Sequence, residues 1–173
     1  MRADHFSDDV QALIALFAKY CVRYLLVGGE AVIYHGHPRL TGDVDFWFDQ
    51  TTDNASRLFA ALGEFWEGAV PGLGDAGELL VPAVVVQFGR PPHRVDLLGA
   101  IDGVRFDEAW PNRVEERIDL EDGRQVSLPV IGLILQDAQN HPWARSRDRA
   151  GGRQGSDVSR IEGRTHPAAL AVA

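Results

Sequence analysis

Three acidic residues in strand-like segments are the strongest candidates for chemistry in this sequence. Asp43 and Asp45 alternate with apolar residues in DVDFWF, and Asp96 lies between apolar residues in RVDLL. Alternate side chains share one face of a strand, so Asp43 and Asp45 would lie ~7 Å apart along it. Carboxylates that share a buried or cleft face repel each other unless a cation lies between them. The pattern therefore indicates a site for a divalent cation.

The available ligand types restrict the metal. Carboxylate oxygens suit Mg²⁺, and the chain has one cysteine and no Cys/His cluster that would favour a softer ion. If Asp96 lies on a strand beside Asp43 and Asp45, all three acids converge on one site, and we predict them as its metal ligands. A lone D-x-D motif is more often an exposed polar face or a strand edge, and this structural interpretation stays open at the level of sequence.

Gly28 and Gly29 supply a second feature. They follow the apolar run from Tyr24 to Val27 and directly precede a helix-compatible segment. A glycine turn at this point leaves backbone N–H groups free to face an anion near a helix N-terminus. A Gly-Gly turn alone is weak evidence for phosphate binding, but next to metal-binding acids it indicates a nucleoside triphosphate site.

The elements that must position these residues follow from the apolar spacing. Helices are predicted over 8–20, with Ser7 as N-cap, over 30–36 and over 52–62, and a loop over 68–77. Strands are predicted over 24–27, 43–49, 83–88, 94–98, 115–120 and 125–128, the last two forming a hairpin. Trp47 and Trp66 are predicted to be packing residues. The mixture predicts an α/β (α+β) fold with a mixed β-sheet flanked by helices.

Length and charge bound the remaining possibilities. The 173 residues are 45% hydrophobic, which suits one globular domain, expected over 1–135. The net charge of −8 argues against binding to nucleic-acid backbone or anionic membrane. A cytoplasmic location is expected, because the chain has neither a signal-peptide pattern nor an apolar run of about 20 residues.

The segment 136–173 differs from the rest of the chain. It contains six arginines and four acids but few large apolar residues. Such a segment buries too little apolar area to offset its loss of conformational entropy. We therefore expect an atypical, flexible C-terminal tail.

The motifs together resemble a known signature. Val27-Gly28-Gly29, Asp43-Val44-Asp45-Phe46 and Val95-Asp96-Leu97 match, in order and spacing, that of the DNA-polymerase-β-like nucleotidyltransferase superfamily. His35-Gly36 and the spacing of Arg39, Thr41 and Asp43 are similar to a small bacterial branch that includes minimal nucleotidyltransferases and AbiEii-like toxins of toxin–antitoxin systems. The resemblance spans roughly 17–133 and implies a nucleotidyltransferase-like fold.

The resemblance implies a two-metal mechanism. Asp43 and Asp45 would hold two Mg²⁺ ions, and Asp96 would complete one metal site and accept the proton of the attacking hydroxyl. Gly28 and Gly29 would cradle the β- and γ-phosphates. Arg39 and Thr41 would contact the triphosphate or the metal shell, although Arg39 is equally well explained as a surface ion-pair partner.

The implied reaction moves an NMP from an NTP to a hydroxyl acceptor, with pyrophosphate leaving. The acceptor stays open between a protein, a tRNA and a small molecule such as an antibiotic. The toxin–antitoxin branch adds an antitoxin as a candidate partner.

The sequence departs from this branch after Leu133. The branch continues into a helix that carries a lysine, whereas the only lysine here is Lys19. A divergent tail and a shifted reading frame near 134–140 both account for the difference. The departure leaves an alternative function open, namely a catalytically silent nucleotide- or partner-binding protein of the same fold.

Overall fold

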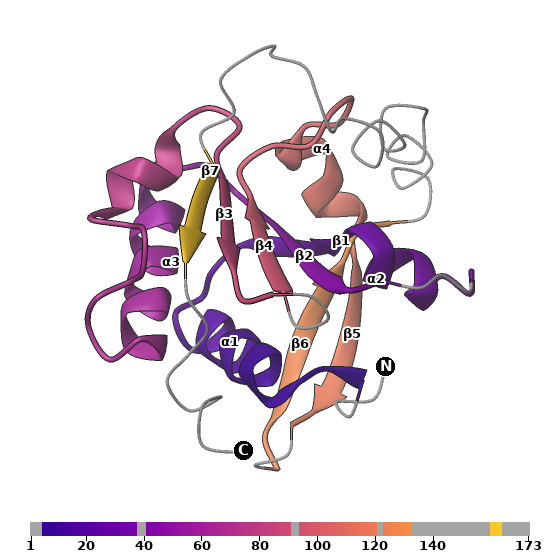
Figure 1. Ribbon diagram of the computed structural model, residues 1–173. Coiled ribbons are helices and arrows are strands. Elements are labelled where there is room, and N and C mark those ends of the chain that lie inside the picture. The colour runs from indigo at the N-terminus through magenta and orange to yellow at the C-terminus, as the bar shows by residue number, and fades with distance from the viewer. Residues whose placement is uncertain (1–4, 38–40, 91–93, 121–122, 133–159, 164–173) are drawn as a thin grey trace.

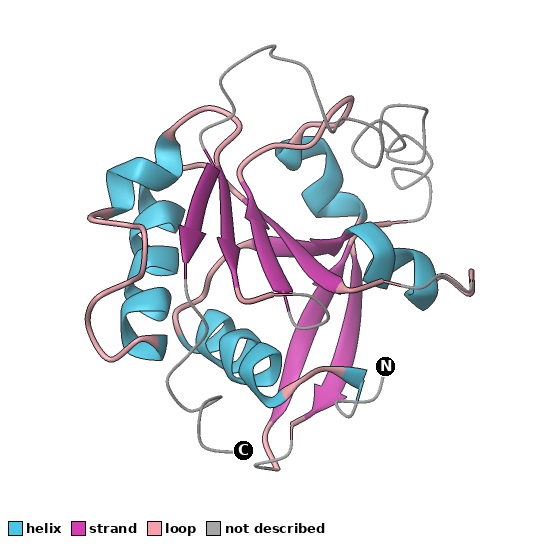
Figure 2. Ribbon diagram, viewed as in Figure 1, coloured by secondary structure: helices cyan, strands magenta, loops and turns pink. Residues whose placement is uncertain are grey.

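The protein folds around one mixed β-sheet with helices on both faces (Figures 1 and 2). The computed structural model describes residues 5–37, 41–90, 94–120, 123–132 and 160–163. The strands are β1 (Tyr24–Val27), β2 (Asp43–Phe48), β3 (Val85–Phe88), β4 (Arg94–Leu98), β5 (Val114–Asp119), β6 (Gln125–Val130) and β7 (Arg160–Gly163). The helices are α1 (Asp8–Lys19), α2 (Gly28–Tyr34), α3 (Thr52–Phe65), α4 (Phe106–Ala109) and the 3₁₀ turns η2 (Ala76–Leu80) and η3 (Trp110–Asn112).

The strand order is β5-β6-β1-β2-β4-β3-β7. The pairs β1–β2, β3–β4 and β5–β6 are antiparallel, and the pairs β1–β6, β2–β4 and β3–β7 are parallel. This arrangement confirms the predicted α/β class with a mixed sheet. Of its central strands, β2 and β4 carry Asp43, Asp45 and Asp96, and the Gly28-Gly29 turn directly follows β1.

The two faces of β2 meet different helices. Phe46 packs edge-on against Phe17 of α1 and Tyr24 of β1, with ring centroids 5.6 and 5.3 Å apart. Its neighbour Trp47 points the other way and packs against Phe106 of α4 at 5.0 Å. In Figure 1, α1 and α3 lie on one side of the view and α2 and α4 on the other. Asp43 and Asp45 share the Trp47 face, because side chains alternate along a strand.

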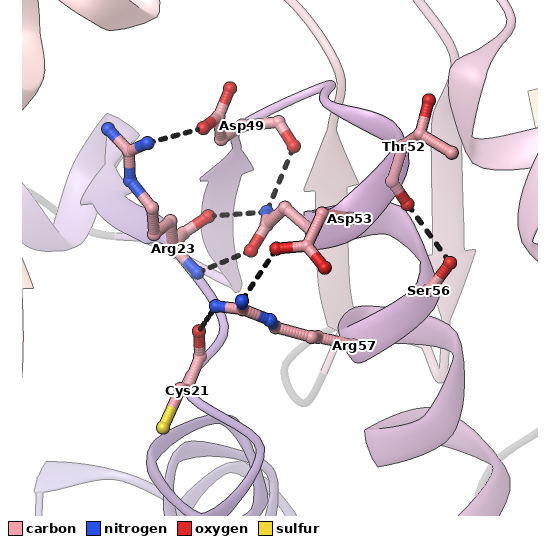
Figure 3. Close-up of polar contacts among 8 residues, drawn as sticks. Cys21, Arg23, Asp49, Thr52, Asp53, Ser56 and Arg57 are labelled. Carbon is pink, nitrogen blue, oxygen red and sulfur yellow. Dashed lines mark hydrogen bonds and ion pairs between the residues drawn. The ribbon is translucent and has the colours of Figure 1, made fainter.

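A polar junction fixes the ends of β1 and β2 against α3 (Figure 3). The buried Asn54 amide donates to the carbonyl oxygens of Arg23 and Asp49, both at 2.9 Å, and its Oδ1 accepts from Arg23 N–H at 2.7 Å. Arg23 also forms an ion pair with Asp49 at 3.0 Å. These contacts hold the end of β2 that lies away from Asp43.

Most predicted elements are present with shifted ends. Ser7 occupies the N-cap of α1, but its side chain makes no cap hydrogen bond. The helix after β1 starts at Gly28 itself, two residues earlier than predicted, and α3 continues to Phe65. The predicted loop over 68–77 holds the start of η2, and α4, at four residues, is too short for apolar periodicity to reveal. Trp47 and Trp66 are buried, as predicted for packing residues.

The core belongs to the first part of the chain. Among the described residues the buried hydrophobic side chains run from Phe6 to Ile131. β7 falls within the segment predicted as a tail, and its backbone pairs in parallel with β3 at the sheet edge. The remainder of 136–173 lies outside the described residues. The longest helix in the described ranges is α3, with 14 residues, and none of these helices has the length and apolar character that crossing a bilayer requires.

Deleting 136–173 should leave a cooperatively folding protein. The deletion removes β7 but none of the buried hydrophobic residues between Phe6 and Ile131, whose burial drives folding. Thermal unfolding followed by circular dichroism should show one sigmoidal transition, with mass measured in parallel to detect dimers. A soluble truncated chain that melts without cooperativity would place part of the core in the deleted segment.

Replacing Tyr24 with phenylalanine should stabilise the protein. The Tyr24 hydroxyl is buried and has no hydrogen-bond partner among the described residues, and burial raises the pKa of this phenol, so it is neutral. Removing an unsatisfied buried hydroxyl should raise the unfolding free energy by about 1 kcal/mol, or the melting temperature by about 2–4 °C.

Tyr34→Phe is the matched control for this substitution. The Tyr34 hydroxyl donates to Glu116 at 3.0 Å, so its loss should lower stability or leave it unchanged. Equal effects of the two substitutions on the melting temperature would show that the Tyr24 hydroxyl is satisfied.

Candidate functional site

The register of β2 and β4 brings the three acids together. These strands pair in parallel, with Asp45 opposite Asp96 and Asp43 opposite Arg94. Neighbouring strands are about 4.8 Å apart, so paired residues on one face have adjacent side chains. One carboxylate oxygen from each of Asp43, Asp45 and Asp96 lies within 4.8 Å of the others. Asp96 is buried, whereas Asp43 and Asp45 are half-buried.

Arg94 provides positive charge inside this cluster. Its guanidinium forms an ion pair with Asp43 Oδ2, and its Nε lies 3.0 Å from Asp96 Oδ1. Arg94 was not predicted as part of the site, although its i, i+2 spacing from Asp96 on one strand places both on the same face. Three carboxylates and one guanidinium leave a formal charge of −2, so the cluster still favours a further cation.

Gln87 of β3 contacts Asp96, the third acid of the cluster, from the neighbouring strand. It pairs with Asp96 across the antiparallel β3–β4 ladder, and its Nε2 donates to Asp96 Oδ2 at 2.8 Å. Asp96 Oδ2 therefore accepts a hydrogen bond from Gln87, while Oδ1 lies within ion-pair distance of Arg94. A polar residue inside the apolar run VVQF was the only sequence signal of this contact.

The two glycines allow the acids to approach the turn after β1. Gly28 has φ +66°, and a Cβ placed there would come within 2.0 Å of Asp45 Oδ2. A Cβ on Gly29 would come within 2.6 Å of Thr41 Oγ1. Thr41 in turn donates to Asp43, with Oγ1 3.0 Å from its carbonyl oxygen and 3.1 Å from Oδ1. Both glycines are thus required by the packing of the acid cluster itself.

Arg39 and other polar residues near the motifs have separate positions. Arg39 lies outside the described residues. Glu30 is buried and its Oε2 contacts His5 Nε2 at 2.5 Å, while His35 Nε2 lies 2.8 Å from the carbonyl oxygen of Ile131. His37 is exposed. The structure brings together Asp43, Asp45, Asp96, Gly28, Gly29 and Thr41, and adds Arg94 and Gln87 to them.

The donor set suits a divalent cation. All three candidate ligands are carboxylates, whose hard oxygens match Mg²⁺, and the residual charge of the cluster is negative. Asp43 and Asp45 are accessible enough for an ion to reach them, while the buried Asp96 is held by a hydrogen bond from Gln87 and an ion pair with Arg94. The residues therefore fit a metal centre, and the identity of the ion is left to experiment.

An open pocket lies further along the same face of β2. It has a volume of about 450 Å³. Its lining residues are Trp47, Asp49, Gln50, Gly99, Ala100, Val104, Arg105, Phe106 and Asp107. Trp47 is only two residues from Asp45, so the pocket and the acid cluster are neighbours on one face of the sheet.

Comparison with known proteins supports the class of fold. No family model and no curated protein matches this sequence. The structure is similar to the crystal structure of a protein from Thermotoga maritima described as a "putative nucleotidyltransferase", with a TM-score of 0.51 and 11% identity. The match covers 86% of this chain and 91% of the other. The chain therefore has an α/β fold similar to that of a nucleotidyltransferase, with a cluster of acids that could hold a metal ion.

Replacing Gly28 with alanine should disrupt the acid cluster. The new Cβ would clash with Asp45, and the left-handed backbone would cost about 1–2 kcal/mol of folding free energy. A lower melting temperature together with at least tenfold weaker Mn²⁺ binding by calorimetry is expected. Gly36→Ala is the matched control, because Gly36 also has positive φ but has no atom within 4 Å of its Cβ position. Equal Mn²⁺ affinities of the two variants would show that Gly28 does not shape the site.

Proposed function

We propose that this protein is a Mg²⁺-dependent nucleotidyltransferase that moves an NMP from an NTP to a hydroxyl acceptor. The observation that carries the proposal is the convergence of Asp43, Asp45 and Asp96 within 4.8 Å, directly against the Gly28-Gly29 turn. The overall similarity to a protein described as a "putative nucleotidyltransferase" supports the same reaction class.

In this proposal each residue of the cluster has a defined role. Asp43 and Asp45 would hold two Mg²⁺ ions, and Asp96 would complete one of these sites. When bound, the ions supply charge stabilisation for the attacking and leaving oxygens of an in-line displacement at the α-phosphorus. Asp96, oriented by Arg94 and Gln87, would accept the proton of the attacking hydroxyl.

The triphosphate would lie beside the glycine turn. Gly28 and Gly29 would contact the β- and γ-phosphates through their backbone N–H groups, which no side chain of their own obstructs. Thr41 bridges the turn and Asp43, a position suited to the metal shell or to the triphosphate. Arg39, two residues before Thr41, is retained as a further candidate contact to the phosphates.

The acceptor and the partner follow from the resemblance alone. A protein, a tRNA and a small molecule are all candidate acceptors, since function on a given fold depends on acceptor sites grafted onto it. The net charge of −8 favours a protein or a small molecule over a large RNA. A role in a toxin–antitoxin system, with an antitoxin as partner, belongs to the same proposal.

One observation favours a second candidate function. The ion pairs of Arg94 with Asp43 and Asp96 also explain two of the acids without any metal. In that case the chain would be a catalytically silent nucleotide- or partner-binding protein of the same fold.

Asp45→Asn separates the two candidates. The protein is incubated with each labelled NTP, Mg²⁺ and total cell extract, and the labelled macromolecule or product is identified. The wild-type protein should transfer label, and Asp45→Asn should reduce the rate by about a hundredfold or more, since loss of the charge weakens metal binding in the transition state. Its melting temperature should be equal or slightly higher, because one like charge leaves the cluster.

Asp53→Asn is the charge-matched control. Asp53 lies on α3, is exposed, and pairs with Arg57 rather than with the cluster (Figure 3). This variant should keep the wild-type rate. Full transfer activity in Asp45→Asn would rule out the metal-binding role of the acids, and an inactive wild-type protein with every NTP would favour the silent alternative.

A further inference from the structure

Arg94 occupies the position among the acids that a cation would take. We infer that its guanidinium is an internal counter-ion that competes with the metal, so that metal binding requires Arg94 to leave Asp43 and Asp96. The inference rests on the proposed metal site and concerns its regulation. It predicts that the ligand-free protein binds divalent ions weakly, although it holds three carboxylates together.

The geometry of Arg94 indicates direct competition with a metal ion for the carboxylates, rather than a remote electrostatic effect. Its Nη2 contacts Asp43 and its Nε lies 3.0 Å from Asp96, so one planar group spans two of the three acids. Arginine suits such a bridge because its donors form a rigid fork. A metal ligated by both Asp43 and Asp96 would take the lone pairs that now face the guanidinium.

Arg94 is also able to move away. Its side chain is 27% exposed, while the Asp96 carboxylate that it contacts is 4% exposed. The Arg94 side chain is thus partly open to solvent, although its Nε is buried, and an outward rotation would carry the guanidinium away from Asp96. A ligand that offers the guanidinium other anionic partners would draw it outwards.

A polyphosphate anion is the ligand class that would do so. Its negative oxygens bind guanidinium groups in bidentate fashion, as the carboxylates do now. The triphosphate would draw Arg94 from the acids at the moment when it delivers its own metal ion. Metal and nucleotide would then bind together more tightly than either binds alone.

The decisive experiment measures Mn²⁺ affinity without nucleotide, by electron paramagnetic resonance of the free ion. Arg94→Met keeps the length of the apolar stem and removes the charge. It should bind Mn²⁺ roughly tenfold more tightly than the wild-type protein, or better. Arg57→Met is the matched control, because Arg57 also pairs with an aspartate, Asp53, but on the exposed surface of α3 (Figure 3). It should bind Mn²⁺ as the wild-type protein does.

A second variant and an NMR titration of the wild-type protein keep the test valid if Arg94→Met does not fold. Arg94→Gln serves as a second neutral substitution if Arg94→Met shows no cooperative melting. In the wild-type protein, the ¹⁵N resonance of Arg94 Nε should shift as Mg²⁺ is titrated and the guanidinium leaves Asp96. The Arg57 Nε resonance should not move.

The possible outcomes separate this inference from the proposed function. If the wild-type protein and the neutral Arg94 variants bind Mn²⁺ equally, and the Arg94 resonance stays in place, the competition is overturned while the metal site stands. If none of them binds Mn²⁺, the metal site and the competition are both overturned. Tighter binding by both Arg94 variants, with Arg57→Met unchanged, supports the inference.

Discussion

Repulsion among three carboxylates is the constraint on which the rest of this structure depends. Two unit charges within 4.8 Å of each other repel by about 3.5 kcal/mol or more at an effective dielectric constant of about 20, before screening by salt. The central strands β2 and β4 nevertheless hold Asp43, Asp45 and Asp96 on one face. Such an arrangement persists only if positive charge and donors are built around it. Arg94 and Gln87 supply part of that compensation, and a bound cation would supply the rest.

The surrounding elements position this cluster. The Asn54 junction ties the far end of β2, the strand that carries two of the acids, to β1 and α3. Glycine at 28 and 29 leaves space for Asp45 and Thr41, which larger residues would displace. The fold itself thus sets the positions of these carboxylates.

The same face continues into an open pocket. Beyond Asp45 the next side chain on this face is Trp47, which packs against Phe106 and lines the open pocket. The similarity to a nucleotidyltransferase concerns the fold, and residues around such pockets differ between proteins that share a fold. The acceptor must therefore be found by experiment.

The sequence by itself determined the local features of this protein. The alternation in DVDFWF placed Asp43 and Asp45 on one face of a strand, and Gly28-Gly29 marked the turn after β1, because both patterns depend on neighbours in the chain. Only the tertiary structure decided which carboxylates meet. Asp96 joins Asp45 through the β2–β4 register across about 50 residues of chain, and the same register turns Arg94 towards Asp43. Strand pairing of this kind depends on the packing of the whole sheet, which no local pattern encodes.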